Sequence, residues 1–568
     1  MTYSFEKKLI KILKNISILL EIKSENPFKS KAYLNAATIL KEQKIDIAEA
    51  IKNNTLKNIK GIGDALQKKI TEYYETGKIQ YYENLIKEIP ETLAELTNVY
   101  NIGIKTAKKL WVEYNITDMN SLEEALLSGK LDKLKGFTLK NKEIMINSIQ
   151  HKKASKGRFL QEEATEESKS FLSRLINIPE IKFAELSGKQ RRFSEVTDEL
   201  IFIIACDDNN LNLFNNFENL KNPDSETYTS LTQSGIPIII KICPTKSFYW
   251  KLHKTTGSEE YITHFLEFVK EMGYNYDDLG IYKDNLPVVI KSENDIYKIL
   301  DLQFIPPEIR EYPLALQRAR KNRIPKLIER SDLKGMIHVH TNWSDGRNSI
   351  REMALKAKEL GFEYIVICDH SQSASYANGL TIEKINLQHR EIDRLNDEDL
   401  GIKIIKGIES DIMRDGSLDY PDEILEKFEI VIASVHSHFN ISKSEMTRRI
   451  IYALMSPYTT MLGHPTGRLL LARPAYQVDT KELIDAAKDY NKIIEINCNP
   501  YRLDLSWEDA FYAKSKGLKL SINPDSHEQN TLTDVEYGIK TARKAWLEKS
   551  DVINCLEFNE FINQFSKK

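Results

Sequence analysis

Seven short apolar runs follow one another in the carboxyl-terminal part of the chain, and six of them end at histidine, aspartate or glutamate. The runs are MIHVH, YIVICDH, KIIKGIE, EIVIASVH, TMLGH, KIIEINCN and LKLSINPDSH. Stretches with a helical pattern separate them, and strands that alternate with helices are typical of a parallel β/α barrel. The carboxyl ends of the strands in such a barrel meet on one face, where functional groups collect.

Nine side chains at or just beyond these strand ends are candidate metal ligands. A single buried histidine is more often a hydrogen-bonded core residue, and an aspartate after a strand often only caps the next helix. Such separate roles do not account for so many of these residues at the same end of successive strands. KIIEINCN contributes no ligand to this prediction, and His389 and His438 are predicted to be structural or to face solvent. The candidates are His338, His340, Asp345, His370, Glu409, His436, His464, Asp525 and His527.

The candidate set is rich in imidazole and carboxylate, and the neighbouring Cys368 is predicted to point away from it. This chemistry suits Zn²⁺, Mn²⁺ or Fe²⁺ rather than a structural zinc site built from cysteines. The set is too large for one ion and is sufficient for two or three ions bridged by carboxylates. Because such centres promote displacement at phosphorus, phosphoester hydrolysis is the predicted reaction class.

The motifs HVHTNWSDG, CDHS, GIESDI, SVH, GHPTGR and NPDSH resemble those of the PHP (polymerase and histidinol phosphatase) domain over residues 331–568. The resemblance implies a distorted (β/α)7 barrel in which the ions are held in three groups. The implied groups are His338, His340, Glu409 and Asp525; Glu409, His436 and His464; and Asp345, His370 and His527. Every family position carries an acceptable ligand, so the domain is predicted to be active.

Two arginines lie just past strand ends of the predicted barrel. Arg468 in HPTGR and Arg502 in NPYRLDL could each bind a phosphate group, because a guanidinium group can donate two parallel hydrogen bonds to it. A surface salt bridge is the alternative role for each arginine. We expect Glu409, Asp525 and Arg468 to be the catalytic residues.

The first 150 residues have a helical pattern and carry three related turns between helices. Glycines in such turns can present backbone N–H groups to a phosphate at the start of the second helix. In the second turn an asparagine replaces the first glycine, which is tolerable because asparagine can adopt a left-handed backbone. The turns and their lysines are Gly61, Gly63, Lys68 and Lys69; Asn101, Gly103, Lys105, Lys108 and Lys109; and, more weakly, Gly136 and Thr138.

Successive turns of this kind indicate helix-hairpin-helix DNA binding, which grips phosphates without reading sequence, although a lone Gly-x-Gly is usually only a turn. Together with NPFKSKAYLNAA they resemble the N-terminal region of the bacterial family X DNA polymerases. In relatives a lysine near the first hairpin acts on abasic sugars, and Lys69 falls at that place. A phosphate-contacting or solvated lysine is the preferred interpretation here.

Residues 160–320 continue this resemblance as an α/β nucleotidyltransferase-like palm with a thumb-like part. The family's chemistry needs Gly-Ser before two arginines, an Asp-x-Asp pair on the second strand and an aspartate on a later strand, which together hold two Mg²⁺ ions. At the corresponding positions this chain has Lys189, Arg191, Arg192, Glu199, Ile201 and Ile239. Isoleucine cannot bind Mg²⁺, so we predict a folded palm without bound magnesium and with polymerase activity lost or severely reduced.

A carboxylate beside the vacant positions does not rescue the palm site. Asp198 points to the opposite strand face from Glu199, since side chains alternate along a strand. Thr256, Gly257 and Ser258 could retain part of a nucleotide site, but a plain turn is the preferred interpretation.

Charge and cysteine content limit the partners and the location. The chain has 80 basic and 83 acidic residues and a net charge of −3, so any nucleic-acid site must be local. The sequence has no evident signal peptide or membrane-spanning run, and its 5 cysteines lack metal-binding spacing. A bacterial cytosolic protein near the nucleoid, without a membrane partner, is expected. The clearest linkers are predicted at residues 151–168 and 311–332.

These observations predict a multidomain DNA repair protein with a helix-hairpin-helix region at 1–150, a degenerate palm at 160–320 and a PHP barrel at 331–568. The barrel is expected to act as a 3′-5′ exonuclease, and further to cut abasic sites or process blocked 3′ ends. The expected partner is gapped, nicked or 3′-ended DNA, bound by a monomer without regard to sequence. The alternatives are an active gap-filling polymerase with unusual ligands, a non-enzymatic DNA-end scaffold and a small-molecule phosphatase.

Overall fold

The structure is a computed structural model, and it describes residues 2–43, 47–53, 55–207, 220–224, 226–232 and 234–565. The chain divides into two compact units. One consists of Met1–Gly157 with Leu231–Gly235, and the other of Arg158–Ser230 with Ile236–Lys568. The second unit therefore contains both the palm and the barrel.

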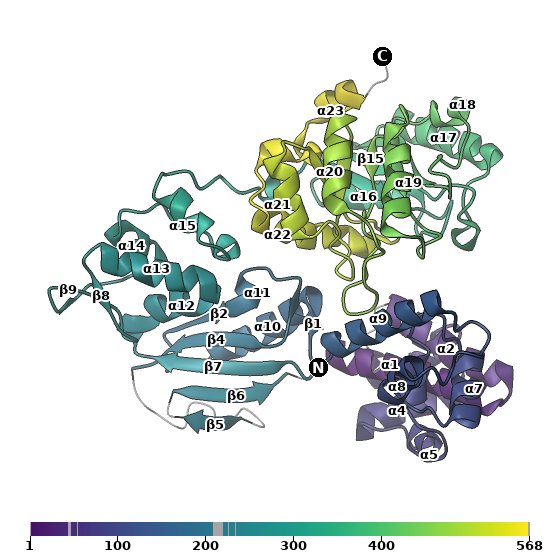
Figure 1. Cartoon of the computed structure of the whole chain (residues 1–568), viewed down its shortest axis with the longest axis horizontal. Coiled ribbons are helices and arrows are strands. Elements are labelled where there is room, and N and C mark those ends of the chain that lie inside the picture. The colour runs from purple at the N-terminus through teal and green to yellow at the C-terminus, as the bar shows by residue number, and fades with distance from the viewer. Residues whose placement is uncertain are drawn as a thin grey trace. The chain divides into compact units, whose positions relative to one another are not determined.

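The first unit is built from helices, as the sequence predicts (Figure 1). Apolar residues at helical spacing, such as Leu9, Leu13 and Ile16 of the first helix, are fully buried in a core shared by these helices. The described helices are α1 (Thr2–Lys23), α2 (Pro27–Gln43), α3 (Ile47–Lys52), η1 (Leu56–Asn58), α4 (Asp64–Thr76), α5 (Gln80–Glu88), α6 (Thr92–Leu96), α7 (Ile104–Tyr114), α8 (Met119–Leu127) and α9 (Leu139–Ser155).

The polar segment 151–168, predicted to be a linker, contains the boundary between the two units after Gly157, but most of it is helical. Helix α9 continues to Ser155 and α10 (Gln161–Ile176) begins soon after the short strand β1 (Phe159–Leu160). The segment is polar because these helices expose much of their surface, and its lysines, glutamates and alanines are good helix formers. The second predicted linker, 311–332, contains the helix α15 (Leu314–Ala319) and the turn η5 (Arg330–Asp332).

The palm is a mixed sheet that, among the described residues, has the strand order β2-β4-β7-β6-β5. Strand β2 runs antiparallel to β4, and β4 runs parallel to β7. One face of β4 packs Phe202 and Ile204 against α10 in an apolar core. The strands are β2 (Phe183–Ser187), β4 (Leu200–Ala205), β5 (Lys221–Asp224), β6 (Thr227–Leu231) and β7 (Pro237–Cys243), and β3 (Val196–Thr197) pairs with β1.

A small helical part follows the palm and has its own core around Trp250, Tyr261 and Phe265. Trp546, which follows the last long helix of the barrel, belongs to the same core. This part and the barrel therefore share packed side chains within one unit. Its elements are η3 (Thr245–Ser247), α12 (Phe248–Thr256), α13 (Glu259–Glu271), β8 (Asn275–Tyr276), β9 (Ile281–Lys283), β10 (Leu286–Pro287), α14 (Glu293–Ile299) and η4 (Pro307–Ile309). The short helix α11 (Gly188–Arg191) lies within the palm, between β2 and β3.

The predicted barrel is confirmed. In residues 335–523, all of which the structure describes, the strands form a seven-stranded parallel sheet in sequence order. Val339 and Ser526 form a parallel bridge between the first strand and the end of the last, so the sheet is nearly closed. The strands are β11 (Gly335–Val339), β12 (Tyr364–Ile367), β13 (Lys403–Asp411), β14 (Ile430–Ser434), β15 (Met461–Leu462), β16 (Ile493–Asn497) and β17 (Leu520–Asn523).

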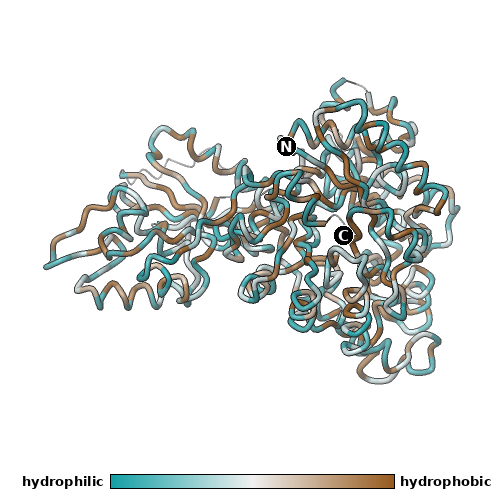
Figure 2. Tube along the Cα trace, turned by 90° about the horizontal axis from the view of Figure 1, so that it is seen from above, coloured by the Kyte–Doolittle hydropathy of each residue, from teal (hydrophilic) through white to brown (hydrophobic). Residues whose placement is uncertain are grey.

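Helices surround the strands of the barrel (Figure 1). Capping boxes begin two of them, with Ser349 and Glu352 at α16 and Ser442 and Glu445 at α19. Hydrophobic and hydrophilic residues alternate along the helices, as expected for elements with one buried face (Figure 2). The helices are α16 (Ile350–Glu359), η6 (Ser375–Ala377), α17 (Ile382–Asp397), α18 (Asp422–Leu425), α19 (Lys443–Met455), α20 (Thr480–Asp489), α21 (Trp507–Ser515), η7 (Gln529–Asp534), α22 (Val535–Lys544), η8 (Lys549–Asp551), η9 (Ile553–Cys555) and α23 (Phe558–Phe565).

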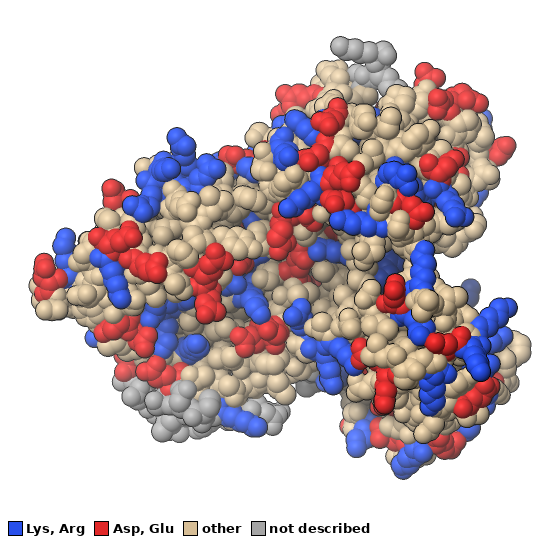
Figure 3. Space-filling view, viewed as in Figure 1, with Lys and Arg blue, Asp and Glu red and all other residues tan. Residues whose placement is uncertain are grey.

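Basic and acidic side chains are interspersed on the face shown in Figure 3, in line with the balanced charge of the chain. All five cysteines are buried and free of disulfide bonds. Among the helices of the described residues, none is long and apolar enough to cross a lipid bilayer.

Candidate functional site

The nine candidate ligands gather at the carboxyl ends of the barrel strands. A register shift in β11 between Met336 and Val339 marks an irregularity, and His338 lies within it with φ 63°. His464 (φ 23°) and Asp525 (φ 52°) also adopt left-handed backbone. Such conformations cost roughly 1–3 kcal/mol for residues other than glycine and cluster at functional sites. The barrel therefore places three of these side chains on strained backbone, which lowers its stability.

Glu409 lies at the centre of the cluster. Its Oε1 lies 3.3 Å from His338 Nε2, 3.3 Å from His436 Nε2 and 3.0 Å from His464 Nε2. Its Oε2 lies 2.9 Å from His370 Nδ1 and 3.6 Å from His340 Nε2. Only 1% of the glutamate is exposed, so one buried carboxylate faces five imidazoles. A carboxylate in this position can bridge two cations.

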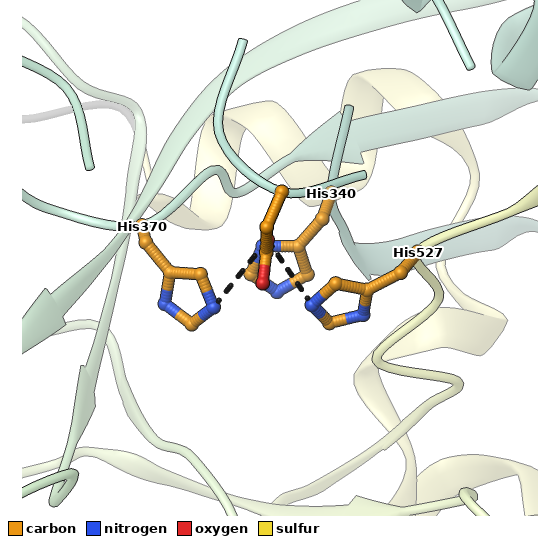
Figure 4. Close-up of side chains that lie close together, drawn as sticks. His340, His370 and His527 are labelled. Atoms are coloured by element: carbon orange, nitrogen blue, oxygen red, sulfur yellow. Dashed lines mark ion pairs between the residues drawn. The ribbon is translucent and has the colours of Figure 1, made fainter. Parts of the chain in front are cut away.

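A second group surrounds Asp345. Its Oδ1 lies 3.3 Å from His527 Nε2 and 3.7 Å from His370 Nε2. His340, His370 and His527 turn their rings toward one another (Figure 4). Asp525 joins the groups, since its Oδ1 lies 3.2 Å from His340 Nε2 and 3.6 Å from His338 Nε2.

Among the described residues, three sets of side chains are spaced closely enough to hold cations. They are His338, His340 and Asp525; His370, Glu409 and His436; and His340, Asp345, His370 and His527. His464 belongs to none of these sets, but it contacts Glu409 of the second set. The structure thus brings all nine candidates together, although it spreads His340 and His370 over more than one set.

Burial and neighbouring charges shift the pKa values of several candidate ligands strongly. Burial opposes ionisation of Glu409, but His436, His338 and His370 outweigh burial and hold its pKa well below the usual range. Burial likewise opposes ionisation of Asp345, and His527 outweighs it and lowers the pKa to about 2. For His340, burial and the neighbouring His527 and His370 lower the pKa to about 3. The carboxylates are therefore ionised and His340 is neutral, which is the state that binds a cation. In contrast, Glu409 outweighs burial and raises the pKa of His436 to about 10, and Asp345 outweighs burial and raises the pKa of His527 to about 9. A cation that binds there would displace protons from these two rings.

Several buried atoms of the cluster make no hydrogen bond of acceptable geometry with any residue that the structure describes, although His370 Nδ1 and Glu409 Oε2 lie 2.9 Å apart. They include His338 Nε2, both ring nitrogens of His340, His370 Nδ1 and Glu409 Oε2. Buried polar atoms are almost always hydrogen-bonded, so a concentration of unpartnered atoms indicates a missing ligand. Oxygen and imidazole nitrogen donors fit divalent transition metals.

Supporting carboxylates surround the ligands, and the sequence analysis missed them. Glu495, in the run predicted to be free of ligands, is fully buried and lies 2.6 Å from His338 Nδ1. Asp411 lies 2.8 Å from His436 Nδ1. A carboxylate on the far nitrogen of a ligating histidine fixes its ring and tautomer. An ionisable residue inside an apolar strand was the signal that could have identified Glu495.

The two candidate arginines differ. Arg502 Nε lies 3.9 Å from Asp525 Oδ2 and is 22% exposed, so it reaches the cluster. Arg468 is instead occupied, because it donates to Glu195 Oε1 at 2.8 Å and to the carbonyl groups of Arg502 and Leu503. The salt-bridge alternative thus describes Arg468 better than the expected catalytic role. Its partner Glu195 comes from the palm, which the sequence pattern did not reveal.

Other residues singled out in the barrel lie outside the cluster. His438 is exposed and hydrogen-bonds Ser437, and His389 packs edge-on against Phe428. Cys368 is buried outside the sets of candidate ligands, and burial raises its pKa to about 12. The buried carboxylate of Asp369 accepts hydrogen bonds from Thr341, Ser344 and Gln388, so it has a structural role.

In the palm, two positions predicted from the sequence to correspond to the family's aspartates are neighbours in space. Ile201 of β4 is in register with Ile239 of β7 and with Ser187 of β2. Glu199 lies just before β4, and Asp198 is held by Lys189, whose Nζ lies 2.9 and 3.0 Å from its carboxylate oxygens. A β-carbon at Gly188 would lie 3.1 Å from the Ile201 side chain, so isoleucine fills this space.

The two palm arginines serve the fold. Arg191 binds the Glu293 carboxylate at 2.5 and 3.1 Å, and Arg310 donates to the same group at 2.6 Å. Arg192 donates to Glu311 at 2.8 Å and to the Thr256 carbonyl at 2.6 Å. Both arginines are therefore committed to the helical part that follows the palm.

The segment predicted to be a plain turn is one. The carbonyl of Thr256 accepts from Arg192, and Ser258 caps α13 through the backbone N–H of Tyr261. A β-carbon at Gly257 would lie 2.6 Å from Tyr261 and 2.8 Å from Ile262, so a side chain has no room there.

The three predicted hairpins share one backbone geometry. Gly61, Asn101 and Gly136 have φ values of 101°, 60° and 96°. Gly63, Gly103 and Thr138 are the extended N-cap residues of α4, α7 and α9. Asn101 thus adopts the expected left-handed backbone.

The helix N-termini that follow Gly63 and Gly103 are open. A β-carbon on either glycine would meet nothing within 4 Å. Of the lysines predicted to contact DNA, Lys68 is exposed, Lys105 is exposed, and Lys108 donates to Ser24 Oγ at 2.6 Å. Lys69 is half-buried and its ammonium group lies 5.4 Å from the centre of the Tyr81 ring.

Comparison with known proteins covers all parts of the chain. Residues 5–79 match a helix-hairpin-helix domain, residues 251–311 a DNA polymerase beta thumb and residues 337–499 a PHP domain. A "Probable phosphatase" of Thermoanaerobacter is 31% identical over 38% of this chain and 88% of its own length. One from Acetivibrio thermocellus is 30% identical over 34% of this chain and 78% of its own length.

Another relative matches over nearly the whole length. The "DNA polymerase/3'-5' exonuclease PolX" of Bacillus subtilis is 34% identical over 99% of both chains. The order of hairpins, polymerase-like sheet, thumb and PHP barrel agrees with this match. The chain therefore belongs to the PolX family.

Proposed function

We propose that this protein is a metal-dependent nuclease that removes nucleotides from DNA 3′ ends, with the barrel as its catalytic domain. The observation that carries the proposal is the convergence of six imidazoles and three carboxylates at the carboxyl ends of the barrel strands, several with buried atoms that lack a hydrogen-bond partner. The name of the Bacillus subtilis relative, which includes 3′-5′ exonuclease, supports the choice of reaction. The hairpins support DNA as the substrate.

Two or three ions of Zn²⁺, Mn²⁺ or Fe²⁺ fit the proposed centre. We propose as ligands the three groups that the family resemblance implies, in which Glu409 is shared between two. These groups are His338, His340, Glu409 and Asp525; Glu409, His436 and His464; and Asp345, His370 and His527. When bound, such ions supply an activated water and positive charge for displacement at phosphorus. Family-wide metal dependence supports this view, while the identity and number of ions are our proposal.

The protein's own groups have separate roles in this reaction. Glu409 and Asp525, ionised and buried, set the charge and position of the metal ligands. Arg502 contacts the phosphodiester, because its guanidinium group lies at the edge of the cluster and is partly exposed. Glu495 and Asp411 are positioning residues that hold the rings of His338 and His436.

We further infer that the palm does not polymerise. The support is the pairing of Ile201 with Ile239 at the positions where the family's metal site needs carboxylates. Its role would be structural, with the hairpins holding gapped or nicked DNA without sequence preference. A monomer close to bacterial DNA in the cytosol completes the proposal, and cleavage at abasic or blocked 3′ ends is a further activity to test.

The test is digestion of a 3′-labelled gapped duplex with Mn²⁺ by the full chain. Wild type should release mononucleotides, and His340→Ala and Asp525→Ala should not. His438→Ala is the matched control, since that histidine is exposed beside the cluster. Equal activity in all four proteins would overturn the assignment.

A small-molecule phosphatase is the second candidate, because the relatives that match the barrel alone are named probable phosphatases. Such an enzyme would hydrolyse a nucleoside monophosphate faster than DNA. Primer extension with four nucleotides tests the polymerase alternative in the same preparation.

A further inference from the structure

A tyrosine beside the cluster of candidate ligands has not been given a role above. Tyr376 lies in η6, between β12 and α17, and 70% of its surface is exposed. Its ring centre lies 6.1 Å from that of His370 and 6.4 Å from that of His436. Both histidines belong to the proposed metal centre. An exposed aromatic ring therefore stands directly beside the site of reaction.

The loop that carries Tyr376 is fastened to the barrel on both sides. Ser371 and Leu380 form a bridge at its base. The backbone N–H of Ser373 donates to Asp419 at 2.6 Å, and the Ser373 hydroxyl donates to Asp411 Oδ2 at 2.7 Å. Asp411 also holds His436, so the loop and a candidate ligand share one support.

Glycine is needed where this loop closes. A β-carbon at Gly379 would lie 1.9 Å from the Ser371 carbonyl oxygen. The backbone N–H of Gln372 donates to the Tyr420 hydroxyl at 3.0 Å. The tyrosine is thus presented from a defined loop, which lowers the entropic cost of using it in binding.

The fold does not account for the position of this ring. Tyr376 belongs to none of the apolar cores found among the described residues, and its hydroxyl has no hydrogen bond in that part of the chain. Exposure of an aromatic ring to water is unfavourable, so a group that covers the ring gains free energy. A nucleobase is a flat group that can stack on it.

We propose that Tyr376 is a specificity-determining residue that stacks on the base of the 3′-terminal nucleotide while the metal centre engages the adjoining phosphodiester. The inference rests on the proposed nuclease function and names its substrate more closely. The enzyme would recognise a phosphodiester that carries a base at the leaving nucleotide, and a base-free ester would lose this contact.

The experiment compares two gapped duplexes in Mn²⁺, whose 3′-terminal nucleotide is either an unpaired adenine or a tetrahydrofuran residue without a base. Stacking on an aromatic side chain stabilises a base enough to change binding by roughly 5- to 150-fold. Wild type should therefore have a higher kcat/KM on adenine by a factor in this range. Tyr376→Ala should lower kcat/KM on adenine alone, whereas Tyr376→Phe and Tyr376→Trp should retain the preference.

Tyr452→Ala is the matched control, because Tyr452 is an exposed tyrosine (57%) on α19 of the same barrel. Equal losses on both duplexes in Tyr376→Ala, or no loss on either, would overturn the proposal. Loss of the preference in Tyr376→Phe would also overturn it, since the hydroxyl would then be the active group.

Failure of the nuclease function is separable from failure of this inference. If wild type cleaves neither duplex, the proposed function fails. The ratio of Kd values for the two duplexes, measured without metal, then decides the role of Tyr376. A ratio that falls to about 1 in Tyr376→Ala but not in Tyr376→Phe supports stacking, and a ratio unchanged by Tyr376→Ala overturns it.

Discussion

The barrel and the palm both bring side chains from neighbouring strands to one place, yet they fill that place with opposite chemistry. In the barrel, Glu409 faces five histidines, and several of the buried atoms of this group lack hydrogen-bond partners among the described residues. In the palm, Ile201 lies beside Ile239, and the nearby arginines are paired with glutamates. One region keeps its ligands at a cost in stability, while the other has an apolar pair and a network of internal salt bridges.

This contrast shows that a fold and its metal site are separable. The palm keeps its strand order and core because these depend on residues such as Phe202 and Ile204, which face away from the site. Ile201 and Ile239, at the positions proposed to correspond to the family's carboxylates, bring no repulsion between clustered charges. The barrel, in contrast, holds left-handed histidines and unpaired buried atoms that serve binding rather than folding.

The largest effect is expected from Glu409→Gln. The amide cannot supply a bridging negative charge to the five surrounding imidazoles, so Mn²⁺-dependent cleavage of 3′-labelled DNA should fall by at least about 1,000-fold. His438→Ala should retain wild-type rates. If Glu409→Gln kept more than a tenth of the activity, the barrel would lose its role as the catalytic domain.

The next largest effect is expected on protein stability, from a substitution in the network of arginines and Glu293. Burial alone would raise the pKa of Glu293, but Arg310 and Arg191 outweigh burial and lower it from 4.5 to about 2. Glu293→Gln should therefore reduce the free energy of unfolding by about 3 kcal/mol at pH 7. The nearby His253 and Tyr297 do not compete, because burial lowers the pKa of the histidine and raises that of the tyrosine to about 12.

The sign of this effect fixes its pH window. The folded pKa lies below the ordinary value, so the stabilisation is complete above about pH 4.5 and is lost as the pH falls toward 2. Urea unfolding at pH 7 and pH 3.5 should show a narrower gap between wild type and Glu293→Gln at the lower pH. Glu271→Gln, in an exposed pair with Arg320, is the control. An identical gap at both pH values would contradict the network.

A smaller effect should follow from Glu495→Gln. Both oxygens of Glu495 accept hydrogen bonds, from His338 and Asn523 on one side and from the His464 backbone and Asn497 on the other. The amide would present N–H groups to donors, so metal affinity should fall by about 10- to 100-fold. Calorimetric titration with Mn²⁺ measures the change, with Glu482→Gln on the exposed face of α20 as the control. Unaltered affinity would remove Glu495 from the support of the centre.

Arg502 and Arg468 are expected to have different roles, one in DNA binding and the other in stability. Arg502→Ala should raise KM for DNA by about 10-fold, because a charged hydrogen bond to phosphate is lost. Arg468→Ala should leave the kinetics unchanged and lower Tm, because Arg468 joins the barrel to Glu195 of the palm. A large kinetic effect in Arg468→Ala would return the arginine to the catalytic role that the sequence suggested.

The smallest effect is expected in the palm. Glu199→Gln should change neither DNA cleavage nor stability measurably, and no protein in the series should extend a primer. Template-dependent extension that disappears in Glu199→Gln would show that the palm retains a working metal site and would reverse the contrast with the barrel.

Much of the fold and most of the candidate site followed from the sequence. The seven strands were recognised from apolar runs, and the nine candidates from residue types at their ends. The left-handed Asn101 followed from hairpin repetition. The predicted linker at 151–168 does contain the boundary between the two units, but its helices were not predicted because a polar, exposed helix and a loop have similar composition. Arg468 was misjudged because its partner Glu195 is 273 residues away in sequence.

Residue identity and periodicity are local properties, so the order of strands, the hairpins and the kinds of donor atom could be read along the chain. The choice of partner is not local. His338 and Glu495 are 157 residues apart in sequence and become 2.6 Å neighbours only when the barrel closes. The supports of the metal centre, the pairing of Arg468 and the place of Tyr376 beside the cluster therefore depend on distances that exist only in the folded chain.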